Sequence, residues 1–167
     1  MNEIFKRVSV RNYEERPVEP EKIEKILRAA MAAPSAGNQQ PWEFYVVTDK
    51  DKIDALSKCS PYAGCAAKAP VVIVPCFKTK DLIFPDFDVI DLAIATENIL
   101  LEITSLELGG VWLAVAPVAE RMESVIKTLG ISEDLKPYAL VPVGYPAKSE
   151  LRPQKDRFDA SRIHYVL

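Results

Sequence analysis

The chain has 167 residues, of which 49% are hydrophobic and 27% charged, and its formal net charge is −3. This composition favours a single globular domain, residues 1–167, and excludes a mainly disordered chain, because enough apolar side chains are present to offset the ordering entropy. The negative charge argues against a nucleic-acid-binding protein. No apolar run is long enough for a bilayer span, and the first residues lack the apolar segment of a secretory signal, so we expect a cytoplasmic protein without membrane contact.

The chain has three cysteines, Cys59, Cys65 and Cys76, and one histidine, His164. An odd cysteine count without a CxxC pair indicates neither a disulfide framework nor a zinc cage, and one histidine cannot supply a histidine-rich metal site. We therefore expect no metal, three buried or half-buried thiols, and a surface histidine.

The first predicted helix follows Pro20 and ends before Pro34, because proline suits a first helical turn and stops a helix that reaches it. Apolar residues in it recur with the spacing of a one-sided amphipathic helix, namely Ile23, Ile26, Leu27, Ala30 and Met31. The segment 34–41, PSAGNQQP, is predicted to be a loop, and Trp42–Val47 a strand, from its aromatic and β-branched residues.

A short helix over Lys50–Lys58 and a buried strand over Pro70–Phe77 come next, followed by a long helix over Phe87–Leu108. At 100° per residue the long helix carries two apolar faces and a narrow polar strip between them. The first face holds Leu92, Ala95, Ile99, Ile103 and Leu106; the second holds Ile94, Leu101 and Leu108; the strip holds Asp91, Asn98, Glu102 and Ser105. Because a helix that is apolar on two sides is buried on two sides, the second face is predicted to meet another subunit.

The remainder reads as a Gly-Gly turn into an apolar strand or loop over Gly109–Ala116, a helix over Ala119–Leu129, and a last strand over Tyr138–Gly144. Gly130 is a typical helix stop. The polar tail from residue 145 is predicted to wrap the surface. Strands that alternate with helices indicate an α+β or α/β fold around a central sheet.

Common catalytic motifs are absent: there is no GxGxxG, no GxxxxGK[ST] and no GxSxG, and a Ser-His-Asp triad is improbable with one histidine. Two basic groups remain. If residues 7–11 are extended, Arg7, Ser9 and Arg11 share one side, an arrangement that suits a phosphate. Lys155 and Arg157 form a second basic pair, and the alternative for both groups is solvated surface charge.

The polar loop before the strand Trp42–Val47 carries clustered amides and a hydroxyl between two prolines, namely Ser35, Asn38, Gln39 and Gln40. Such a group suits recognition of the edge of a planar heterocycle. The alternative is an ordinary polar loop that caps the preceding helix.

Taken in order, several segments of the sequence resemble those of the FMN-dependent nitroreductase family, over roughly residues 4 to 165. They are KRVSVRNY, APSAGNQQPWEFYVV, KAPVVIV, DLAIATENILLEITSLELGGVWL, VPVGYP and the basic KDR tail. The PSxxNxQPWxF block and the long D-x-A-x-A-x-x-N helix that ends in LGGVWL are the specific parts. The resemblance implies an α+β nitroreductase-like fold, with a central, mostly antiparallel sheet flanked by helices, in a homodimer with two FMN sites at the interface.

The resemblance also implies which residues bind FMN. Arg7, Ser9 and Arg11 match the segment that binds the phosphate, and Lys155 and Arg157 match the basic pair that meets the same phosphate. Ser35, Asn38 and Gln40 match a flavin-contacting loop that usually comes from the partner subunit. Leu113, Ala114 and Val115 match the strand end against the isoalloxazine ring.

The implied activity is two-electron transfer from NAD(P)H to a nitroaromatic, a quinone or a similar small acceptor by a ping-pong mechanism, with no side chain expected as catalytic acid or base. The alternatives are other flavin chemistry on the same scaffold, of the dehalogenase, flavin-fragmenting oxygenase or azoline oxidase type, and a flavin-binding storage or regulatory protein. The sequence departs from the family pattern at Val8, at Ala114 and between Phe77 and Phe87. In the stretch between Phe77 and Phe87, larger members insert helices over the substrate channel.

Overall fold

A computed structural model describes residues 3–150 and 153–166 of the chain. Its α-helices are α1 (Glu3–Lys6), α2 (Pro20–Met31), α3 (Lys50–Leu56), α4 (Asp88–Ser105) and α5 (Ala119–Leu129). Its strands are β1 (Trp42–Val47), β2 (Val71–Lys78), β3 (Gly109–Gly110), β4 (Leu113–Ala114), β5 (Leu135–Pro137) and β6 (Ala139–Gly144). The predicted helices and strands are confirmed, whereas α1 and β5 were not predicted. No described helix is both long and apolar enough to cross a membrane.

The strands form one six-stranded sheet in which β1, β2, β6 and β3 are neighbours in that order, β4 also pairs with β6, and β5 pairs with β2. Every one of these strand pairs is antiparallel. Gly110 lies opposite Val143, and Leu113 lies opposite Leu140, so β3 and β4 keep a single register along β6. The stretch from Gly109 to Ala114 therefore behaves as one interrupted strand at the edge of the sheet.

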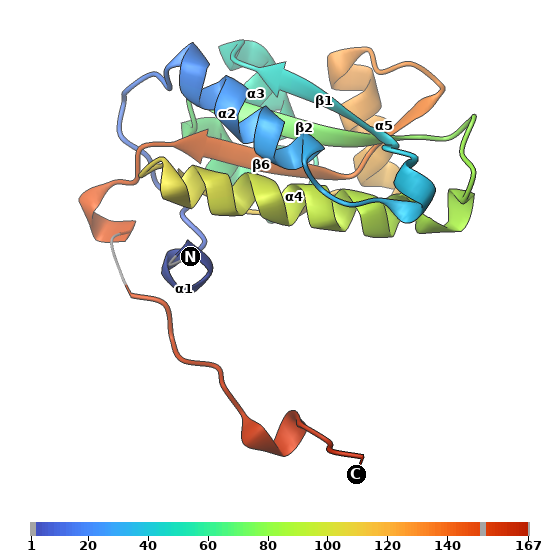
Figure 1. The fold of residues 1–167 in the computed structure, drawn as a ribbon. Coiled ribbons are helices and arrows are strands. Elements are labelled where there is room, and N and C mark those ends of the chain that lie inside the picture. The colour runs from blue at the N-terminus through green and yellow to red at the C-terminus, as the bar shows by residue number, and fades with distance from the viewer. Residues whose placement is uncertain (1–2, 151–152, 167) are drawn as a thin grey trace.

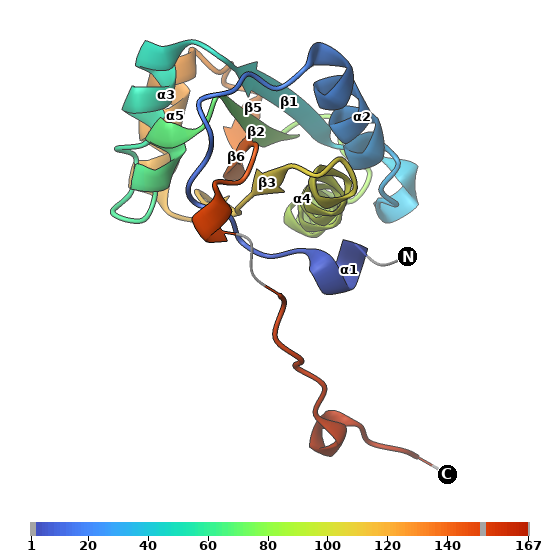
Figure 2. The ribbon, with the colours of Figure 1, turned by 90° about the vertical axis from the view of Figure 1, so that its left-hand side faces the viewer.

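Helices cover both faces of the sheet, with α2 and α4 on one face and α3 and α5 on the other (Figures 1 and 2). The alternation of side chains along β2 explains why both faces are filled: Val72 and Val74 pack in the core with α3 and α5, whereas Val71 and Ile73 pack in the core with α2 and α4. The α+β class with an antiparallel sheet follows from this arrangement.

The inner face of α4 is buried as predicted, with Leu92, Ala95, Ile99 and Ile103 at most 1% exposed. The second predicted face is only partly correct. Leu108 is not on it, because the helix ends at Ser105, the Leu108 N–H donates to the Ile103 carbonyl at 2.9 Å, and the side chain is buried in the core. Ile94 does point outward, with 37% of its surface exposed.

The carboxyl-terminal tail does not wrap the surface of its own chain, contrary to the prediction. Beyond Gln154, which still contacts Arg7, residues 155–166 lead away from the body of the molecule (Figures 1 and 2). Its large side chains are exposed, with Phe158 at 76% and Tyr165 at 79%. A polar composition predicts a surface position for such a tail, but it does not say whether the tail finds apolar partners on its own chain.

Candidate functional site

The amino-terminal segment that carries Arg7, Ser9 and Arg11 lies against the free edge of β3. Ser9 forms a parallel bridge with Gly110, and the Val10 N–H donates to the Gly110 carbonyl at 3.0 Å. The neighbouring Gly109 has no room for a side chain, because an added Cβ would lie 2.6 Å from Val10 Cγ1. The segment is thus held closely against the edge of the sheet.

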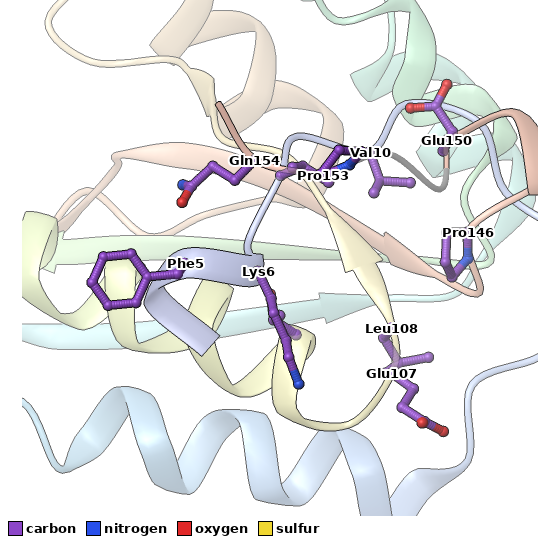
Figure 3. A pocket seen from close by; sticks show the side chains of 11 residues that line it. Phe5, Lys6, Val10, Glu107, Leu108, Pro146, Glu150, Pro153 and Gln154 are labelled. Carbon is purple, nitrogen blue, oxygen red and sulfur yellow. The ribbon is translucent and has the colours of Figure 1, made fainter. Parts of the chain in front are cut away.

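The side chains of this segment alternate, as extended backbone requires. Val8 and Val10 line a cavity of about 550 Å³, together with Phe5 and Lys6 of α1 and with Pro153 and Gln154 at the start of the tail (Figure 3). Arg7 lies elsewhere, with its Nε 3.7 Å from the Glu97 carboxylate on α4. Burial raises the pKa of Glu97, an effect that the charge of Arg7 opposes. Arg7 is therefore half-buried beside an acid, and Arg11 is exposed.

Two contacts connect the amino-terminal segment to the start of the tail. The Glu150 carboxylate accepts the Arg11 N–H at 3.2 Å and the Asn12 amide Nδ2 at 2.6 Å. The Gln154 amide Nε2 donates to the Arg7 carbonyl at 3.1 Å. Lys155 follows Gln154 directly, so its Cα lies about 3.8 Å from the Cα of the residue that makes this contact. Lys155 and Arg157 themselves are exposed in the tail.

The predicted ring-contacting residues lie farther along the same edge of the sheet. Leu113 and Val115 are buried, whereas Ala114 between them is exposed. The Ala114 carbonyl accepts a hydrogen bond from Arg121 Nη1 at 3.0 Å, so a cation on α5 stands beside this strand. Sequence reasoning missed Arg121, because nothing in a helix pattern indicates which strand its charged face meets.

The third predicted group, in the loop between α2 and β1, is brought together by its own hydrogen bonds. Ser35 Oγ accepts the Gln40 N–H at 3.0 Å, and the Gln40 side chain donates to Asn38 Oδ1 at 3.1 Å. Gly37, Asn38 and Gln40 all have positive φ, at 55°, 55° and 48°. Left-handed backbone is unusual for asparagine and glutamine, so the surrounding structure must hold the loop in this shape.

Two side chains outside the predicted set hold this loop. Asp91, on the first turn of α4 and 2% exposed, accepts the Ala36 N–H at 2.9 Å through Oδ1 and the Gln39 amide Nε2 at 2.8 Å through Oδ2. Gln39 also donates to the Phe84 carbonyl at 3.0 Å and accepts the Phe84 N–H at 2.9 Å. We call these contacts the Gln39–Asp91 clasp.

The sequence placed Asp91 in a polar strip but did not show what that strip faces. In the structure the strip meets α2 and the loop after it, since Asn98 Nδ2 donates to the Ala29 carbonyl at 3.0 Å. The loop and the amino-terminal segment lie toward opposite ends of α4 (Figure 1). From Asp91 to the end of α4 at Ser105 the helix rises roughly 21 Å. Within one chain, therefore, the basic segments and β4 lie along one edge of the sheet. The loop that carries Ser35, Asn38 and Gln40 lies away from Ser9.

The predictions for the three thiols and for His164 agree with the structure. Cys59 and Cys65 are half-buried and free, and Cys76 is buried and free. Burial raises the pKa of all three thiols, that of Cys76 to about 12. His164 is exposed, and within residues 3–150 and 153–166 no group of side chains is arranged to hold a metal ion.

Comparison with known proteins gives one consistent family. The sequence pattern of the nitroreductase family matches residues 4–61 and 58–145. A protein of Archaeoglobus fulgidus, provisionally named an NADH dehydrogenase/NAD(P)H nitroreductase, is 42% identical over 163 residues, which are 96% of this chain and 94% of that protein.

Two solved structures extend the comparison to the fold. A Clostridium acetobutylicum protein, provisionally named an NADH oxidase, superimposes with a TM-score of 0.93 at 48% identity and covers 97% of both chains. An FMN-dependent nitroreductase of Clostridium difficile superimposes with a TM-score of 0.89 at 29% identity, over 98% of this chain and 97% of that one.

Proposed function

The chain belongs to the nitroreductase family of flavin oxidoreductases, and on this premise we propose that residues 1–167 form one FMN-binding domain that passes electrons from NAD(P)H to a small acceptor. Nitroaromatics and quinones are the acceptor classes proposed. The FMN-dependent relative and the NAD(P)H-using relative support the cofactor and the electron donor respectively.

The observation that carries the proposal is the hydrogen bond from Gln154 to the Arg7 carbonyl, because it joins the two basic segments that a phosphate would need. Guanidinium and ammonium groups make charge-assisted hydrogen bonds to phosphate oxygens, and the two joined segments supply such donors in Arg7, Arg11, Lys155 and Arg157, with the Ser9 hydroxyl as a neutral donor. This donor set fits the phosphate of FMN.

The edge of the sheet fits the remainder of the cofactor. Gly110, beside the phosphate-binding segment, and Ala114 are four residues apart in one register, which is about 13 Å of extended strand. At the far end, Ala114 offers a small exposed side chain between two buried residues, against which a flat ring can lie. When bound, FMN supplies the two-electron chemistry, and the chain holds and orients it.

We propose further that the active protein is a homodimer. Ser35, Asn38 and Gln40 lie toward the opposite end of α4 from Ser9, so the same cofactor cannot easily meet both groups within one chain. A two-fold partner could bring its own loop to this edge. The exposed Ile94 on α4 and the exposed Phe158 and Tyr165 of the tail would find cover in the same association.

Anaerobic spectroscopy tests the proposed function. The purified protein should show the absorbance bands of oxidised flavin, or gain them with added FMN, and NADH or NADPH should bleach them; a nitroaromatic or quinone should then restore them. Cofactor released by heat should be FMN and not FAD. A protein that binds no FMN, or whose bound flavin neither nicotinamide reduces, would contradict the proposal.

A further inference from the structure

Loop 35–40 adopts a conformation that its own sequence does not favour. Asn38 and Gln40, two of the three loop residues proposed to contact FMN, have positive φ. Each such residue costs free energy that some tertiary contact must offset. The hydrogen bonds among Ser35, Asn38 and Gln40 link the loop to itself, and they do not fix it to the body of the protein.

The Gln39–Asp91 clasp provides that fixation. Asp91 is 2% exposed, and a carboxylate so deeply buried requires donors. The two donors that it accepts from, the Ala36 N–H and the Gln39 side chain, both belong to the loop. The position of Asp91 in the first turn of α4 adds a favourable interaction with the helix dipole, so the anchor is itself held rigidly.

The clasp also reaches a second segment. Gln39 binds both the N–H and the carbonyl of Phe84, in the stretch between β2 and α4. The Phe84 ring packs against Gly37, where an added Cβ would lie 2.7 Å from Phe84 Cε2. Phe84 in turn stacks edge-on with Phe87, at 6.3 Å between ring centroids, and both rings are nearly half exposed. An exposed aromatic pair is therefore fixed beside the loop.

We propose that Asp91 and Gln39 are positioning residues, which hold loop 35–40 in its left-handed shape for flavin binding and keep Phe84 and Phe87 beside it. This inference rests on the proposed function, because it concerns the loop that carries Ser35, Asn38 and Gln40. Neither Asp91 nor Gln39 is required to touch the cofactor. Their contribution is to remove the ordering cost that a mobile loop would pay on binding.

Asp91→Asn tests the clasp with almost no change of shape. Asparagine keeps one acceptor but presents an N–H₂ group to a donor, either Ala36 N–H or Gln39 Nε2, so one of the two bonds is lost. Loss of a charge-assisted bond should speed hydrogen exchange of the Ala36 or Phe84 amide in the flavin-free protein by about tenfold or more. The dissociation constant for FMN should rise by a similar factor.

A second substitution separates this role from general destabilisation. Gln39→Glu alone places a second carboxylate against Asp91 and also loses the bond to the Phe84 carbonyl, so it should weaken FMN binding strongly. Adding Asp91→Asn to Gln39→Glu restores a donor opposite an acceptor, so the double variant should bind FMN about tenfold more tightly, and exchange more slowly at Ala36, than Gln39→Glu alone. Asp88→Asn, the same change in the same first turn but without a contact to the loop, is the control and should alter neither quantity.

The outcomes distinguish the two proposals. A wild-type protein that does not bind FMN contradicts the proposed function before any variant is made. If the wild type binds FMN and Asp91→Asn binds it equally well, the positioning role is wrong while the proposed function stands. The role is equally wrong if Asp91→Asn fails to improve the affinity of the Gln39→Glu variant, or if Asp88→Asn weakens FMN binding as much as Asp91→Asn.

Discussion

Gly37 lies in the loop proposed to bind FMN and Gly109 lies against the amino-terminal segment, and each is required for a different physical reason. Gly37 combines a φ of +55° with an aromatic ring in the space a side chain would need. Gly109 has no positive φ, and it is excluded from carrying a side chain only by the close approach of Val10. At Gly109, therefore, space alone decides the effect of a substitution.

Gly109→Ala should push the amino-terminal segment away from the sheet. The new Cβ would meet Val10 at 2.6–2.8 Å, and overpacking of this kind costs about 1–3 kcal/mol. We expect a lower free energy of unfolding in urea and weaker FMN binding, because Ser9 and Val10 are paired with Gly110. Gly64→Ala is the control: nothing lies within 4 Å of its Cβ, so its stability should stay within about 0.5 kcal/mol of wild type. Equal stability of the two variants would contradict the close packing.

The lowered pKa of Glu19, which precedes α2, predicts how the stability of the protein changes at acid pH. The Tyr145 hydroxyl donates to its carboxylate at 3.0 and 2.7 Å, and this bond is the main reason that the pKa of Glu19 is lowered from 4.5 to about 2. Because the folded pKa is lowered, the stabilisation is present above about pH 4.5 and is lost as the pH falls toward 2. Tyr145→Phe should raise the pKa of Glu19, as carboxyl NMR would measure.

The same variant should show less dependence of stability on pH. Between pH 5 and pH 3 the wild type should lose more free energy of unfolding than Tyr145→Phe, because the variant no longer carries the lowered pKa that links folding to deprotonation. Tyr165→Phe, which alters an exposed tyrosine in the tail, should retain the wild-type dependence. Identical pH profiles for wild type and Tyr145→Phe would refute the assigned cause.

At the scale of elements, local signals predicted those segments that end at strong stop signals. The strand Trp42–Val47 and the helix Ala119–Leu129 have the predicted bounds, since Pro41 precedes the first and Gly130, with φ of +66°, ends the second. The strand β5 was not predicted, because its three residues are a strand only through pairing with Lys78 and its neighbours on β2. Short elements of this kind depend on tertiary contacts that no local pattern contains.

The residues of the candidate site were predictable from the sequence, but the contacts that hold them were not. The family resemblance named the residues of the basic segments, the loop and β4, and their contribution to FMN binding remains a proposal. It did not indicate the contacts that hold them, such as Asp91 to Ala36 or Gln154 to Arg7. Those contacts join residues more than 50 positions apart, and only the fold brings them together.

The two basic segments predict a specific loss when either is neutralised. Arg7→Ala or Arg157→Ala should weaken FMN binding by roughly tenfold to a hundredfold, since a hydrogen bond to a charged group contributes about 1.5–3 kcal/mol. Riboflavin, which lacks the phosphate, should bind the variants almost as well as wild type. Flavin fluorescence titration with both ligands measures the difference. Arg162→Ala, which removes a charge paired locally with Asp159 in the tail, is the control. Equal losses for FMN and riboflavin would show that these arginines do not meet the phosphate.

At the scale of the whole molecule, the site residues fall into two groups that one chain keeps apart. The basic segments and β4 follow the edge of the sheet, whereas the loop is fixed by Asp91 at the start of α4 (Figure 1). The tail that carries Lys155 and Arg157 leaves the body with apolar side chains exposed (Figure 2). Both features are expected of a chain whose site is completed by a second copy.

A complementation experiment tests this arrangement directly. One chain carries Ser35→Ala with Gln40→Ala, and the other carries Arg7→Ala with Arg157→Ala, so each homodimer has two defective sites. If the loop of one chain serves the phosphate-binding segments of the other, a mixed dimer has one site with all substitutions and one with none. Denaturing and refolding the two chains together in equal amounts should make half of the dimers mixed, and about one quarter of all sites should then bind FMN with wild-type affinity. If each site is built within a single chain, or if the protein sediments as a monomer, mixing recovers no such binding.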